Sequence, residues 1–196
     1  MLMDKVEPVW MKNYAPGYMG FTYQSTSILS KGISFFTRWE RMSDIRVSHS
    51  FVVQDKDTVI QAHAGSGVAI ASITLMFNDP FTQVFFRKPR EWNPDIGHRI
   101  VAVAESHIGE KYDLDLIAVH AIAGTALGRL LKVPEKLYDF FDSPEKWICS
   151  ELCAHCMDLQ PEYKDKGVLS MAECAIDPQD LFEDNVIFAD WKNEGV

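Results

Sequence analysis

The first half of the chain alternates apolar and polar residues in short runs, the pattern of half-buried β-strands. Residues 47–53 (VSHSFVV) and 58–63 (TVIQAH) are the clearest runs, and the polar residues 54–57 between them predict a hairpin loop. Further strands are predicted at residues 17–24, 68–75 and 83–87 and, near the end of the chain, at 186–189.

Helical spacing of apolar residues dominates the second half. Helices are predicted at residues 25–41, 94–108, 114–138 and 148–157. The first of them has Ser25 or Ser27 as its N-cap, and the third is interrupted near Pro134. Because the strands come early and the helices late, we expect an α+β fold with an antiparallel sheet or small barrel packed against helices. No Pro/Gly/Ser-rich linker divides the chain, so we expect one domain over residues 1–196.

Composition narrows the class of protein. The chain has 196 residues, 47% hydrophobic and 24% charged, which is typical of a globular domain with a core of its own. Its formal net charge of −9 argues against nucleic acid as a partner, because nucleic-acid binders need a basic surface.

The cellular location is inferred from the N-terminal residues and from the longest apolar run of the chain. The N-terminus carries an early acid and no apolar signal-peptide core, so we expect a cytoplasmic protein. The apolar residues 114–131 are interrupted by Asp115, His120 and Arg129, which favours a buried helix over a membrane span. Contact of this stretch with a membrane, a lipid or a second copy stays open, as does the oligomeric state.

Three of the four cysteines, Cys149, Cys153 and Cys156, lie within eight residues. Their spacing resembles that of an iron–sulfur ligand set, but the segment is helical in pattern and has no glycine or proline to form a ligand loop. A zinc site would need further ligands, for which only Cys174 and scattered histidines are available. We therefore expect no metal and no cofactor, and we interpret Cys153 and Cys156 as core residues on one helix face.

Cys149 differs from the other cysteines because it falls in the first turn of its predicted helix. Unpaired N–H groups and the positive end of the helix dipole favour a thiolate there, so we expect a lowered pKa and a nucleophilic role. A thiol nucleophile also needs a base and a group that orients the base.

His49 is the best candidate for the base, since it lies on a predicted strand between two serines. Gln61 and His63 lie on the next strand. If the loop between paired positions has an odd number of residues, both share a face with His49. The loop contains neither Asn-Gly nor Asp-Gly to favour a two-residue turn, so we expect the odd loop.

The order of these residues resembles the permuted branch of the NlpC-type, papain-like cysteine peptidases, and most closely its YiiX/YebB-like group. The matching segments are residues 48–49 (SH), 59–62 (VIQA), 109–113 (GEKYD), 149–152 (CSEL) and 177–181 (DPQDL). In this branch the histidine and the polar residue precede the cysteine. The resemblance covers residues 17–190.

The resemblance implies a circularly permuted papain-like fold with Cys149 as nucleophile, His49 as general base and Gln61 as the residue that orients the base. Relatives commonly carry Glu at the position of Gln61; an amide still accepts from the imidazole but does not stabilise imidazolium by charge. Tyr112 matches a tyrosine that lies near the substrate cleft in the family. Its alternative role is structural, as a capping aromatic side chain.

The resemblance further implies that Ser48, Ser150 and Glu151, beside the catalytic positions, bind substrate. The segment 114–141 is long for its place in this fold and is expected to be a helical insertion.

The leading interpretation is therefore a thiol hydrolase that cleaves an amide bond in a small peptide or amino-acid amide, for example one derived from cell wall. Two alternatives remain. Related permuted folds include lecithin:retinol acyltransferase-like enzymes, and the apolar residues 114–131 would suit such a lipid-directed activity. The Gln in place of Glu would also suit a binding or structural module whose catalytic site has decayed.

Overall fold

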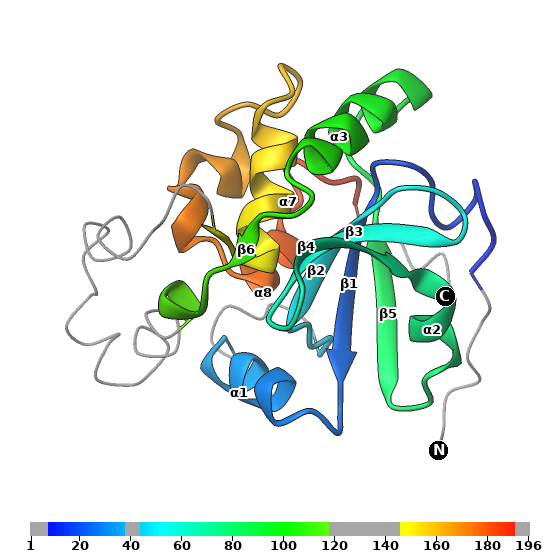
Figure 1. Cartoon of the computed structure of the whole chain (residues 1–196). Helices are drawn as coiled ribbons and strands as arrows, with labels where there is room; N and C mark the ends of the chain where they lie inside the picture. The colour runs from blue at the N-terminus through cyan, green and yellow to red at the C-terminus, as the bar shows by residue number, and fades with distance from the viewer. Residues whose placement is uncertain (1–7, 38–43, 118–145, 191–196) are drawn as a thin grey trace.

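The computed structural model describes residues 8–37, 44–117 and 146–190. Its centre is a five-stranded antiparallel sheet in the order β4-β3-β2-β1-β5. The strands are β1 (Met19–Gln24), β2 (His49–Val53), β3 (Thr58–His63), β4 (Gly67–Ser72) and β5 (Thr82–Arg87). Helices flank both sides of the sheet (Figure 1), so the expected α+β class with an antiparallel sheet is confirmed.

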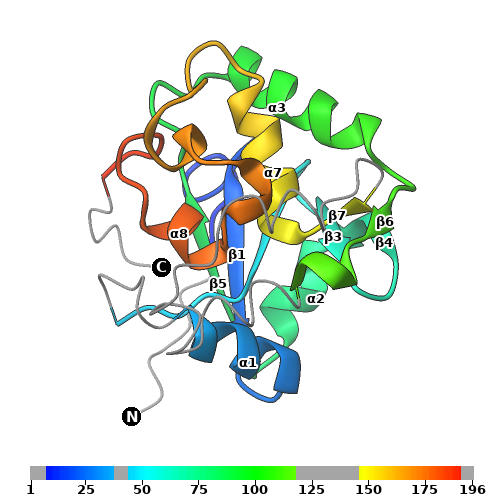
Figure 2. The ribbon, with the colours of Figure 1, turned by 90° about the vertical axis from the view of Figure 1, so that its left-hand side faces the viewer.

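The helices are α1 (Ile28–Phe36), α2 (Ile73–Asn78), α3 (Pro94–Ser106), α7 (Cys149–Asp158) and α8 (Pro178–Glu183), with 3-10 turns η1 (Gly167–Ser170) and η2 (Glu173–Ala175). Ser27 caps α1 by accepting from the Ser30 N–H, as one of the two expected caps. Seen from the side, α7 runs from the middle of the molecule toward α3, and α1 lies below its start (Figure 2).

Side-chain alternation along the strands divides the core between the two faces of the sheet. Val52 and Ile60 face the larger cluster, which also contains apolar residues of α3, α7 and α8. Phe51 and Val59 face the smaller cluster, which is completed by Ile73 of α2 and by residues near the N-terminus. His49 and Gln61 have the same parity as Phe51, so their side chains belong to the face that α2 covers.

Two short parallel strands, β6 (Lys111–Tyr112) and β7 (Lys146–Trp147), lie beside β4. The Val68 N–H donates to the carbonyl of Glu110, and the Gly109 N–H donates to the carbonyl of Val68. Since α7 begins two residues after β7, this pairing brings Tyr112 to the start of α7.

Several predicted elements differ from the structure. The strand expected at residues 68–75 ends at Ser72, and Ile73, Met76 and Phe77 continue as helix α2 with their side chains toward the sheet. The strand expected at 186–189 is reduced to an isolated bridge between Pro89 and Phe188, and the Ile187 N–H donates to the Asp184 carboxylate instead of to a neighbouring strand.

Other differences concern helices. Helix α8 was not predicted, although Asp177 caps it and Pro178 occupies its first turn, both ordinary start signals. Of the helix expected at 114–138, residues 114–117 are helical and the remainder lies outside the described residues, as does most of the expected insertion at 114–141. Within the described part of the chain, no helix combines the length and the apolar character needed to cross a membrane.

Gly20 of β1 makes room for the ring of Phe51, its partner on β2. A Cβ at Gly20 would lie 1.9 Å from Cε2 of Phe51, which is fully buried. We expect Gly20→Ala to lower the free energy of unfolding by about 1–3 kcal/mol, measured by urea denaturation. Gly32→Ala in α1 is the control, since nothing lies within 4 Å of its added Cβ. A Gly20→Ala variant as stable as the Gly32→Ala variant would contradict this packing.

Candidate active site

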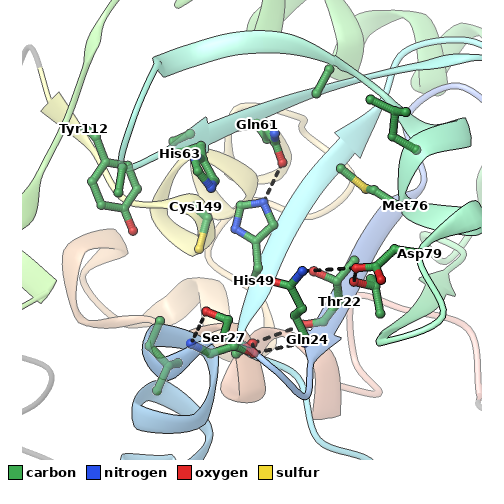
Figure 3. Close-up of a pocket in the computed structure, with 18 of the residues that line it drawn as sticks. Thr22, Gln24, Ser27, His49, Gln61, His63, Met76, Asp79, Tyr112 and Cys149 are labelled. Atoms are coloured by element: carbon green, nitrogen blue, oxygen red, sulfur yellow. Dashed lines mark hydrogen bonds between the residues drawn. The ribbon is translucent and has the colours of Figure 1, made fainter.

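A pocket of about 360 Å³ opens on the α2 side of the sheet, between the start of α1 and the start of α7. Five of the sequence-predicted site residues line it: Cys149, His49, Gln61, Tyr112 and Ser48. They come from β2 and the residue before it, from β3, from β6 and from α7, so residues about one hundred positions apart in the sequence meet here (Figure 3).

The pairing of β2 with β3 sets the geometry of His49 and Gln61. Val53 pairs with Val59, so five residues separate the paired positions and the expected odd loop is confirmed. His49 Nε2 and Gln61 Oε1 lie 2.7 Å apart. Because a carbonyl oxygen only accepts, the imidazole donates from Nε2, and Nδ1 of neutral His49 is left as the basic atom.

Figure 3 shows the other ring nitrogen of His49 on the side of Cys149 and His63. Burial lowers the pKa of His49, while the hydrogen bond that the ring donates to Gln61 acts in the opposite direction. The neutral amide of Gln61 therefore fixes the tautomer without charging the ring.

Cys149 is the first residue of α7 and is 2% exposed. β2 and β3 pair only near their shared loop, at Val52 and Val53, and the start of α7 packs against both strands. Ser50, next to His49 on β2, is fully buried, and its hydroxyl makes no hydrogen bond to the described residues. The thiol and the imidazole of His49 line the same pocket, and in the view of Figure 3 the Cys149 sulfur lies on the side of the ring away from Gln61.

The electrostatics of Cys149 differ from the expectation. The sequence predicts a lowered pKa at the helix start, but burial raises the pKa of the Cys149 thiol. The polar groups of Ser50 and the backbone N–H groups of Cys149 and Ser150 lower this pKa and are the smaller effect. In this state the pair is a neutral thiol beside a neutral imidazole.

Two predicted substrate-binding residues do not line the pocket. Ser150 is fully buried, and its hydroxyl donates to the carbonyl of Ile176 at 2.7 Å. The Glu151 carboxylate accepts from the Ile148 N–H at 3.1 Å. Both side chains therefore fix the first turn of α7, and with it the position of Cys149.

Ser48 and Tyr112 do line the pocket. Ser48 is buried, and its hydroxyl lies 2.5 Å from that of Ser30 of α1. Burial raises the pKa of Tyr112, and the neighbouring Cys149 adds to this effect, so its hydroxyl stays protonated.

The wall of the pocket opposite Cys149 was not predicted from the sequence. That wall includes Asp79 at the end of α2, whose carboxylate accepts from Gln24 at 3.0 Å and from Thr82 at 2.5 Å. Nothing in the local sequence marks this wall, since its residues come from separate elements. Ser50 could have been found, because it belongs to the same Ser-His-Ser run as His49.

The remaining cysteines pack in the interior. Cys153 and Cys156 belong to the larger core cluster on the face of α7, and Cys174 packs with Leu116 and Ile148. All four thiols are free. Among the residues that the structure describes, no group of three or more His, Cys, Asp or Glu side chains is placed to hold a metal ion.

Comparison with known proteins adds no relative to this geometry. No protein-family model matches the chain, and a search of curated proteins also gives no match. The function is therefore inferred from the arrangement of the residues in the pocket.

Proposed function

We propose that this chain is a thiol hydrolase with a circularly permuted papain-like fold of the NlpC type, which cleaves an amide bond in a small peptide or amino-acid amide. The observation that carries the proposal is the hydrogen bond between His49 Nε2 and Gln61 Oε1 in the same pocket as Cys149. That arrangement supplies a nucleophile, a base and a group that orients the base.

The proposed reaction begins from the neutral pair. His49 Nδ1 takes the proton of the Cys149 thiol while Sγ attacks the substrate carbonyl carbon. The tetrahedral intermediate collapses as the C–N bond breaks, and the nitrogen of the leaving amine takes the proton from His49. Water then attacks the thioester with His49 as its base, which releases the carboxylic acid and restores the Cys149 thiol.

The start of α7 supports the stabilisation of the intermediate. The backbone N–H of Cys149 is in the first turn of a helix, where N–H groups have no partner within the helix. One such donor to an oxyanion is worth about 3 kcal/mol in other hydrolases. The buried hydrogen bonds of Ser150 and Glu151 hold this turn in place.

Acyl transfer is the second candidate function. The pocket wall formed by α2 includes Leu75, which is 73% exposed, and Met76. An acyl chain or lipid acceptor would find apolar contacts there before it reached Cys149.

The test is a panel of aminoacyl and peptidyl amides assayed with and without an added amine or a phospholipid acceptor. We expect release of free carboxylic acid, with water as the acceptor. Transfer of the acyl group mainly to the lipid would instead establish the acyltransferase. No acyl chemistry on any amide of the panel would contradict both and favour a binding module.

We also propose a cytoplasmic location, in keeping with four free thiols.

A further inference from the structure

A second imidazole lies beside the proposed catalytic pair. His63 ends β3, is exposed, and lines the same pocket. Its ring centroid is 6.1 Å from that of His49, and the two rings are perpendicular. In Figure 3 the His63 ring reaches from β3 toward Cys149 and His49. Continuing the β2–β3 register past Val52 and Ile60 would place His63 opposite His49, on the other side of the opening that holds Cys149.

The two imidazoles have different hydrogen-bonding roles. Gln61 already occupies Nε2 of His49, so His63 does not orient the base. The Gly65 N–H donates to Nδ1 of His63 at 3.3 Å, which places the proton of the neutral ring on Nε2. Nε2 makes no hydrogen bond to the described residues and therefore offers a donor to the pocket.

The charge state suits a neutral donor. Partial desolvation of the ring where it lines the pocket and the neighbouring His49 both lower the pKa of His63, which favours the uncharged ring. A neutral imidazole that donates to a substrate oxygen acts through the charge that develops there, and it does so without competing for the proton that His49 carries.

We propose that His63 Nε2–H donates to the carbonyl oxygen of the bound amide as that oxygen becomes an oxyanion, as the second donor beside the backbone N–H of Cys149. This role depends on the proposed function, since it acts on the intermediate that Cys149 forms. No proton is transferred from His63: the hydrogen bond strengthens as charge develops and weakens when the C–N bond breaks.

A peptide aldehyde tests the role directly, because its thiohemiacetal with Cys149 places an oxygen where the oxyanion would lie. We expect His63→Ala to weaken aldehyde binding and to lower kcat/KM by similar factors, each about 100-fold. The rate of alkylation of Cys149 by iodoacetamide should change by less than about threefold, since alkylation develops no oxyanion. His63→Gln should recover part of both losses because its amide is also a neutral donor.

His98→Ala is the matched control, since His98 is an exposed histidine of α3 outside the pocket. Unchanged aldehyde binding in His63→Ala would overturn the proposed role. A parallel fall in alkylation would overturn it too, because His63 would then act on the thiol. If the wild-type protein forms no aldehyde adduct at all, the nucleophilic role of Cys149 fails first and this role fails with it.

Discussion

Cys149→Ala is expected to lower kcat/KM for amide hydrolysis by at least about 10,000-fold, because the variant has no atom that can form the thioester. The remaining donors and the imidazole would still bind substrate, so KM should change much less than kcat. The comparison is made with purified wild-type and variant protein on the best amide of the panel, under saturating and limiting substrate.

Cys153→Ala is the matched control for this experiment. Cys153 lies one turn further along α7 and is also buried, but it does not line the pocket. It should retain activity within a few fold, with any loss explained by its stability. If Cys149→Ala hydrolyses the substrate at the wild-type rate, Cys149 is not the nucleophile.

His49→Ala is expected to lower kcat/KM by about 1,000- to 10,000-fold, because the thiol is then left protonated with no base beside it. The raised pKa of Cys149 makes this dependence strong. If the thiol ionised at the helix start without a base, His49→Ala would lower kcat/KM far less.

The pH dependence follows from the same pair. Neutral His49 is the active form, so kcat/KM should fall as the pH drops through the pKa of His49. Burial places that pKa below the usual value near 6.5. In Gln61→Glu, a carboxylate next to Nε2 would stabilise imidazolium, so the acidic limb of the profile should move to higher pH. If the acidic limb stays at the same pH in Gln61→Glu, the hydrogen bond between His49 and residue 61 does not determine the pKa of His49.

The strands that carry the site could be predicted because their apolar and polar residues alternate. The position of Gln61 relative to His49 followed from parity alone, once the loop was taken as odd. Helix α2 was missed because residues 68–77 form an almost continuous apolar run that conceals the periodicity, although the packed residues Ile73, Met76 and Phe77 lie at helical spacing.

The electrostatics of Cys149 show why local position is insufficient. The helix start favours a thiolate, but burial between β2, β3 and α7 has the larger effect on the pKa, and burial depends on contacts distant in sequence. Ser150 and Glu151 show the same limit: adjacency to Cys149 predicted substrate contact, whereas their side chains fix the backbone of α7.

The nucleophilic role of Cys149 is tested by acid-quenched intact and peptide mass spectrometry of the protein mixed with a slowly hydrolysed acyl substrate. We expect an added acyl mass on Cys149 in the wild-type protein and in Cys153→Ala, and much slower formation of this adduct in His49→Ala. Turnover of the substrate with the acyl group on another residue, or with none detectable on Cys149 at any time, would contradict it.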